Sequence, residues 1–160
     1  MRIIGIDPGT AIVGYGVLDY IGNQFKVVAY GAITTPATSP MSARLKTIYQ
    51  ELQAVIELYQ PAHIAVEELF YNTNAKTVIS VGQARGVILL AGAEANLEVA
   101  EYTPLQVKQA VVGYGRAEKK QVQEMIKILL KLEKVPKPDD VADALAIAIC
   151  HAHSYKLGRL

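Results

Sequence analysis

The chain is poor in cysteine and histidine and has no tryptophan. Its 160 residues include one Cys and three His. With Cys150 as the single cysteine, no disulfide can form within the chain, and this fits a reducing cytoplasm. Few thiol and imidazole groups also disfavour a zinc site, so any metal centre has to be built from oxygen ligands.

Long apolar runs are absent as well. No stretch approaches the roughly 20 apolar residues that a membrane-spanning helix needs, and we expect no membrane partner. Asp7 interrupts the apolar N-terminal stretch after a few residues, so we do not expect a signal peptide. The chain is 51% hydrophobic, which is enough for a single domain, 1–160, with a sizeable core.

The net charge of +1 conceals an uneven distribution. Residues 108–137 contain eight Lys or Arg against three Glu, whereas residues 47–107 contain two basic and seven acidic residues. A basic C-terminal region next to an acidic body suggests that one face binds a polyanion. A solvated helix face explains these charges equally well, so charge alone does not decide.

Apolar periodicity predicts an α/β protein. Three strands with short turns come first and favour an antiparallel meander, and helices and strands then alternate. This order indicates a mixed sheet with helices on both faces. The expected strands are 2–7, 12–19, 24–34, 62–66 and 97–102, and the expected helices are 42–59, 74–96, 104–112, 117–132 and 139–154.

Four acidic residues far apart in the chain lie at the ends of apolar segments. Asp7 and Glu67 each follow a short apolar strand, and Asp140 and Asp143 open the apolar C-terminal helix. A carboxylate at the end of a buried segment is unfavourable unless a cation meets it. Ligands bind outside strand ends in sheets of this kind, so we expect the four side chains to converge.

Three of the four acids also have a simpler explanation. Asp7 precedes a Pro-Gly pair, which is ordinary turn chemistry, and Glu67 can be a solvated strand end. Acids at a helix start cap free N–H groups, and we assign that cap to Asp139. Asp143 lies three residues after Asp140, on the same face and among apolar residues, where capping does not explain it.

Together the four carboxylates form a hard-oxygen set that suits Mg²⁺, with Mn²⁺ as a substitute. Two such ions about 4 Å apart can hold the attacking and leaving oxygens of a phosphodiester during an in-line displacement. Gly9 and Gly14 suggest that a phosphate approaches the backbone near Asp7. The sequence therefore predicts metal-dependent phosphodiester hydrolysis.

The helix expected over 74–96 contains three glycines, Gly82, Gly86 and Gly92. Each costs about 1 kcal/mol of helix stability relative to alanine, so a reason for keeping them is needed. Close approach to another backbone is one reason, and we expect this helix to form the contact between two copies of the chain. Packing against its own sheet is the alternative.

Several motifs occur in order along the chain: Gly5-Ile6-Asp7-Pro8-Gly9-Thr10 with Gly14-Tyr15-Gly16, Glu67-Glu68-Leu69-Phe70, Gly82-Gln83-Ala84-Arg85-Gly86, Gln106-Val107-Lys108-Gln109, Val111-Val112-Gly113, Ala117-Glu118-Lys119, and Asp140-Val141-Ala142-Asp143-Ala144-Leu145-Ala146. Together they resemble the RuvC family of Holliday-junction resolvases over essentially the whole chain. The first motif alone would be a weak signal, whereas the ordered set is very specific.

The resemblance implies a ribonuclease H-like fold with a five-stranded mixed sheet. It implies a homodimer that nicks four-way DNA junctions symmetrically in recombination and repair, leaving 5′-phosphate and 3′-hydroxyl ends. The implied cofactor is Mg²⁺, with two ions expected per site, and the implied catalytic and metal-binding residues are Asp7, Glu67, Asp140 and Asp143. The implied partner is the RuvA–RuvB branch-migration complex.

Six further residues are candidates for DNA binding. The aromatic ring of Phe70 can stack on an unpaired base, worth about 1–3 kcal/mol, or can pack against the next helix. Lys108 and Lys119 match family lysines that contact DNA near the cleaved phosphate. The other candidates are Arg85, Arg116 and Lys120. Solvation explains the last two equally well, and the arginine of the glycine-rich helix can instead serve the dimer contact.

Two other functions fit part of the pattern. Actin-like ATPases and sugar kinases share a Gly-Ile-Asp-x-Gly-Thr strand and turn, but they need two such domains around a nucleotide. Clear stabilisation by ATP in a thermal-shift assay would favour them. A non-catalytic junction-binding protein would not need four placed acids, so Asp7→Asn distinguishes that function from a nuclease.

Overall fold

The computed structural model describes residues 1–69 and 75–158. Its elements are β1 (Arg2–Asp7), β2 (Ile12–Ile21), β3 (Gln24–Thr34), α1 (Met41–Tyr59), β4 (His63–Glu67), α2 (Ala75–Glu94), β5 (Glu98–Tyr102), α3 (Pro104–Val112), α4 (Lys119–Leu129) and α5 (Asp139–Leu157). Every expected element is present, and the ends of several are shifted by a few residues. For example, α4 begins at Lys119 because Glu118 and Gln121 form a capping box there. None of the helices in the described ranges is long and apolar enough to cross a membrane.

The five strands form one mixed sheet in the order β3-β2-β1-β4-β5. The first three pair antiparallel, as the meander predicts, and β4 and β5 add to β1 in parallel. Ile6 pairs with Val66, so β1 and β4 end side by side. Asp7 and Glu67 are therefore the last residues of two adjacent strands and lie at the same end of the sheet.

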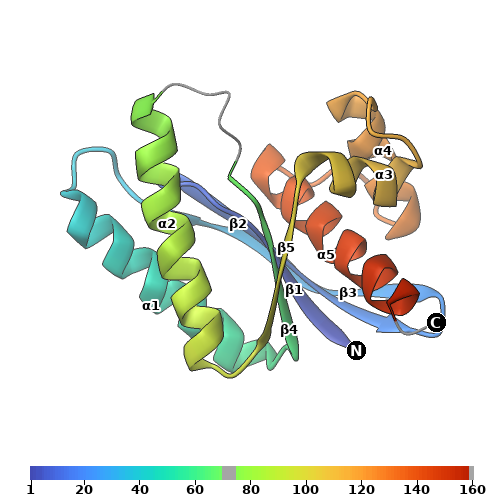
Figure 1. The fold of residues 1–160 in the computed structure, drawn as a ribbon, viewed down its shortest axis with the longest axis horizontal. Coiled ribbons are helices and arrows are strands. Elements are labelled where there is room, and N and C mark those ends of the chain that lie inside the picture. Colours follow the sequence, from blue (N-terminus) through green and yellow to red (C-terminus); the bar gives the residue numbers. More distant parts are fainter. Residues whose placement is uncertain (70–74, 159–160) are drawn as a thin grey trace.

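Helices cover both faces of the sheet (Figure 1). Side chains alternate along a strand, so Ile4 and Ile64 pack with α1 and α2, whereas Ile3 and Ala65 pack with α5. The same alternation places Asp7 and Glu67 on the α5 face, because each stands an even number of residues from those core positions. Strand register thus determines which helix meets the two acids.

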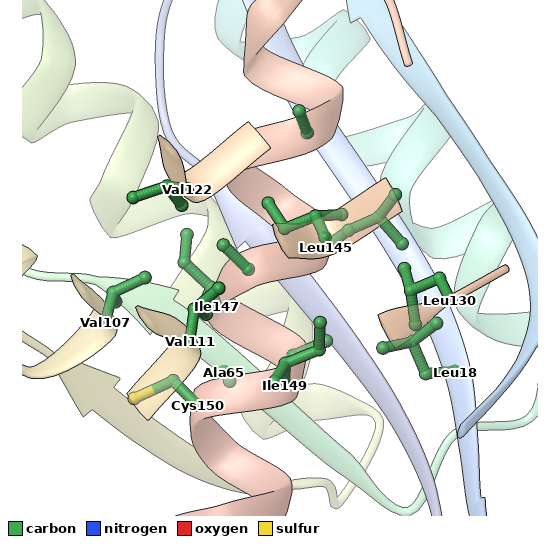
Figure 2. Packing of buried hydrophobic residues seen from close by; sticks show 14 of the residues in the cluster. Leu18, Ala65, Val107, Val111, Val122, Leu130, Leu145, Ile147, Ile149 and Cys150 are labelled. Carbon is green, nitrogen blue, oxygen red and sulfur yellow. The ribbon is translucent and has the colours of Figure 1, made fainter. Parts of the chain in front are cut away.

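The core on this face is built around α5, whose residues from Ala144 to Ala152 are all buried. Figure 2 shows Leu145, Ile147 and Ile149 of α5 among side chains from β2, α3 and α4. An apolar helix that is buried on nearly all sides has little freedom to shift, because the surrounding residues are close-packed. The position of Asp143, next to this buried segment, is fixed accordingly.

Glycines let α5 lie directly on the sheet. A Cβ at Gly14 would stand 2.0 Å from the Asp140 carbonyl oxygen, and one at Gly5 would stand 2.2 Å from the Ala144 carbonyl oxygen. The expectation that Gly14 admits a phosphate is therefore wrong, since the backbone of α5 covers that position. A Cβ at Gly9 would meet the Ile12 carbonyl oxygen at 2.3 Å, so that glycine serves the turn itself.

Candidate active site

Four carboxylates gather where β1, β4 and the first turns of α5 meet. We call Asp7, Glu67, Asp140 and Asp143 the acid cluster. Asp7 pairs with Gly14 across β1 and β2, and the space above Gly14 is filled by the backbone of Asp140. The charges of the other three acids all reach Asp7, so the structure brings together the residues that the sequence predicts.

Burial and mutual repulsion perturb the cluster. Burial, followed by the charges of Glu67, Asp143 and Asp140, raises the pKa of Asp7 to about 9. Burial and the charge of Asp143 raise the pKa of Glu67 to about 7, although Lys119 and Lys108 oppose the shift. Burial also raises the pKa of Asp143. The site therefore holds more negative charge than its surroundings neutralise.

Two predicted lysines border the acid cluster. Lys119 Nζ lies 3.5 Å from Asp143 Oδ2 and 3.5 Å from Asp139 Oδ2. Lys108 and Lys119 line a cleft of about 210 Å³ together with Glu67 and Asp143. Both lysine ammonium groups are therefore within reach of an anion that binds beside the acid cluster.

Other predicted residues lie differently. Arg116 and Lys120 are exposed, on the connection from α3 to α4 and in the first turn of α4. Phe70 lies outside the described residues. The Arg85 side chain is 19% exposed and has contacts within the chain: its Nε donates to the Glu67 carbonyl oxygen at 3.2 Å, and its Nη2 pairs with Glu101.

The N-terminus of α5 differs from the expected one. Pro138 occupies the cap position, and Asp139 is already the first helical residue. Instead of capping, its carboxylate pairs with Lys137 at 3.0 Å and with Lys119. The assignment of Asp139 as the cap is therefore wrong: the helix begins one residue earlier than that assignment requires, and the carboxylate of Asp139 faces two ammonium groups.

Sequence reasoning also missed a contact that joins β5 to α5. Tyr102, which pairs in register with Glu67, has its hydroxyl 2.9 Å from His151 Nδ1. Burial, followed by the charge of His63, lowers the pKa of His151 to about 4, so this imidazole is neutral at pH 7. The contact between Tyr102 and His151 depends on the register of β5, which the sequence does not show. The close packing of α5 on the sheet could have been found, because Gly5 and Gly16 lie inside strands.

The donor chemistry fits a divalent cation. In the described ranges, no three Asp, Glu, His or Cys side chains already surround a common point in a metal-binding arrangement. The acid cluster nevertheless supplies oxygen ligands alone. Burial, followed by repulsion among the acids, raises the pKa of Asp7 and Glu67, and a bound cation would offset both effects. Asp7, Glu67, Asp140 and Asp143 are therefore the residues that could hold a divalent cation.

Comparison with known proteins gives consistent matches. Residues 3–151 match the family model described as crossover junction endodeoxyribonuclease RuvC. The RuvC of Alkaliphilus oremlandii is 65% identical over 154 residues, which cover 96% of this chain and 94% of the relative. The RuvC of Heliobacterium modesticaldum is 63% identical over 158 residues, which cover 99% and 98%. A Thermus thermophilus RuvC solved in complex with a Holliday junction substrate has a TM-score of 0.94 and 36% identity, covering 99% of this chain and 96% of that one.

Proposed function

The chain belongs to the RuvC family of crossover junction endodeoxyribonucleases, and we propose that the acid cluster is its catalytic centre. It is a nuclease that resolves Holliday junctions in recombination and DNA repair. One observation above all supports the assignment of the site. Glycines under α5 bring Asp140 over the end of β1, so that acids from three elements act on one another.

The cluster acts on a scissile phosphate through charge and position. Asp7 and Glu67 end two neighbouring paired strands, and Asp143 lies in α5 directly before its buried segment. When bound, Mg²⁺ at these carboxylates supplies a Lewis acid for the phosphoryl oxygens and lowers the pKa of an attacking water. We expect two ions per site and Mn²⁺ as a substitute. The expected products carry 5′-phosphate and 3′-hydroxyl ends.

Lys108 and Lys119 hold the phosphodiester. Both border the cleft beside Glu67 and Asp143, and Lys119 is 57% exposed, which leaves its ammonium accessible to DNA. Phosphate contacts of this kind set the position of the backbone without reading the bases. We propose that Arg116 and Lys120 extend this basic surface along the duplex arms.

We propose that Phe70 contributes to recognition of the junction. Stacking of its ring on an unpaired base would favour the junction over ordinary duplex. We expect Phe70→Ala to reduce junction resolution more than it reduces non-specific duplex binding, measured side by side by nicking and by gel shift. Equal losses in both assays would point to a packing role.

We propose that two copies of the chain associate through α2. Ile79, Gln83, Gly86 and Leu90 are exposed and follow a 4-3-4 spacing, which places them on one face of the helix. Ile79 and Leu90 are 64% and 52% exposed, and a Cβ at Gly86 would meet nothing within 4 Å. By contrast, Gly92 packs against Ile64 of its own sheet. An apolar stripe of this kind suits a self-complementary contact.

Two substitutions test the dimer. Ile79→Glu with Leu90→Glu should halve the mass measured by sedimentation, because charge repels charge across a two-fold axis. Lys46→Gln on the exposed face of α1 serves as the control. An unchanged mass in the double variant would place the contact elsewhere.

The wider setting rests on the family. We propose that the protein acts in the cytoplasm, where bacterial DNA lies, together with the RuvA–RuvB branch-migration complex. Co-sedimentation of the protein with that complex on a four-way junction tests the partnership. Recovery of the protein on the junction only when the complex is absent would count against it.

Cleavage mapping on a mobile four-way junction tests the site. We expect wild type to nick in Mg²⁺ but not in Ca²⁺, and Asp7→Asn to bind the junction without nicking it, because the amide keeps the shape of the side chain but cannot ionise to hold the cation. Nicking by Asp7→Asn at the wild-type rate would refute the carboxylate mechanism.

A further inference from the structure

An arginine on the opposite side of the sheet from the acid cluster binds the backbone of a catalytic residue. Arg85 lies in the middle of α2, yet its Nε donates to the carbonyl oxygen of Glu67 at 3.2 Å. Glu67 is the last residue of β4, where the sheet no longer supplies hydrogen bonds on all sides. A backbone carbonyl at such a position needs a partner if it is to stay fixed.

The same guanidinium is held from a second direction. Its Nη2 pairs with Glu101 of β5, which stands beside Val66 in the parallel register. A guanidinium is planar and its donors have fixed directions, so two simultaneous contacts define its position. Arg85 thus joins α2, the end of β4 and the adjacent strand.

We infer that Arg85 is a positioning residue for Glu67 and that Glu101 holds it in place. This inference rests on the proposed function, because it requires Glu67 to be catalytic. Glu67 presents its carboxylate to the cleft beside Lys108 and Lys119 on the α5 face, while Arg85 holds its backbone from the α2 face. A second hollow, of about 240 Å³, is lined by Glu67, Arg85 and Pro8 on this side of the sheet.

The sequence alone suggested that Arg85 binds DNA or takes part in the dimer contact. With the side chain 19% exposed and two donors directed within the chain, neither role accounts for its geometry. The three roles make different predictions. A DNA contact would change junction affinity and its salt dependence, a dimer contact would change mass, and a positioning role would change neither.

Arg85→Gln is the central test, with Lys46→Gln as a control that removes one exposed positive charge from α1. We expect Arg85→Gln to keep its dimer mass and its junction affinity in Ca²⁺. Its single-turnover nicking rate should fall about 10–100-fold, as is typical when a group that orients a ligand is removed. Mn²⁺ binding without DNA, followed by electron paramagnetic resonance, should weaken in the same range.

Further variants separate geometry from charge. Glu101→Gln should produce a smaller loss, and the double variant should be no worse than Arg85→Gln alone, because both residues act through one contact. Arg85→Lys should fail to restore the full rate, since one ammonium does not replace two directed donors.

Three results would overturn the inference: wild-type nicking and Mn²⁺ binding in Arg85→Gln, a loss confined to junction affinity or mass, or full recovery with lysine. Failure of the proposed function would look different. In that case wild type itself would not nick the junction, and Glu67→Gln would not differ from it.

Discussion

The placement of Asp140 by a glycine can be tested with one methyl group. In Gly14→Ala, the new Cβ would start 2.0 Å from the Asp140 carbonyl oxygen and 2.9 Å from the Val141 nitrogen. Both atoms belong to the backbone, so no rotation of a side chain relieves the clash. Ordinary contact begins at 3.4 Å, and the first turn of α5 therefore has to move by about 1.4 Å.

This shift has two measurable consequences. Overpacking of this kind costs about 1–3 kcal/mol, and each kcal/mol lowers the Tm of a domain of this size by roughly 2–4 °C. Displacement of a catalytic group by about 1 Å can reduce the rate about 10²-fold. We therefore expect Gly14→Ala to unfold at a lower temperature, to bind junctions normally in Ca²⁺, and to nick them about 100-fold more slowly in single-turnover assays.

Gly16→Ala is the matched control. Its Cβ would meet the Leu145 side chain at 2.5 Å, further along the same helix, and the nearest backbone atom, Leu145 Cα, only at 3.2 Å. It should lower stability without moving Asp140, and should keep most of the nicking rate. Wild-type nicking by Gly14→Ala, or an equal loss in the two variants, would refute the reasoning that this glycine places the acid.

Three further predictions follow from charge. Asp7 has a folded pKa of about 9 against an ordinary 3.8, so it is protonated at pH 7, and Mg²⁺ binding should release a proton. Calorimetry in two buffers of different ionisation enthalpy should detect that proton in wild type but not in Asp7→Asn, and its absence in wild type would contradict the assignment. His151 has a folded pKa of about 4 against 6.5, so the unfolded chain binds the extra proton, and up to about 3 kcal/mol of stability should be lost as the pH falls from 6.5 towards 4. The free energy of unfolding in urea should depend less on pH over this window in His151→Gln than in wild type. Equal pH dependence in the two proteins would rule out His151 as the cause. Junction affinity should fall steeply with salt, and Lys108→Gln or Lys119→Gln should each reduce the logarithmic slope by about 1; an unchanged slope would exclude the phosphate contact.

The order of elements and the four acids could be read from the sequence because each has a local cause. Apolar alternation and helical spacing defined every strand and helix to within a few residues. Asp7 and Glu67 stood out because a polar group that ends an apolar strand has few structural reasons to be there. Asp143 stood out because a charge beside a buried helical segment needs a partner.

Roles that depend on distant neighbours could not be read in this way. The sequence separated Asp140 from Asp139 but assigned Asp139 to the helix cap, whereas its carboxylate pairs with Lys137 and Lys119. Gly14 looked like part of a phosphate-binding turn until the backbone of α5 was found above it. Arg85 looked like a residue for DNA or for the dimer contact, and only the packing of α2 against β4 brings its side chain to Glu67.

The sequence by itself determined the family, the fold class and the identity of the acids, since motif order, periodicity and residue chemistry are properties of the chain. Only the tertiary structure decided how far apart those acids lie, which lysines neutralise them, and which side chains hold their backbone in place. The physical reason is range. Propensity and patterning act over a few residues, whereas the pKa of Asp7 and the hydrogen bond on Glu67 arise from groups brought together across strands and helices.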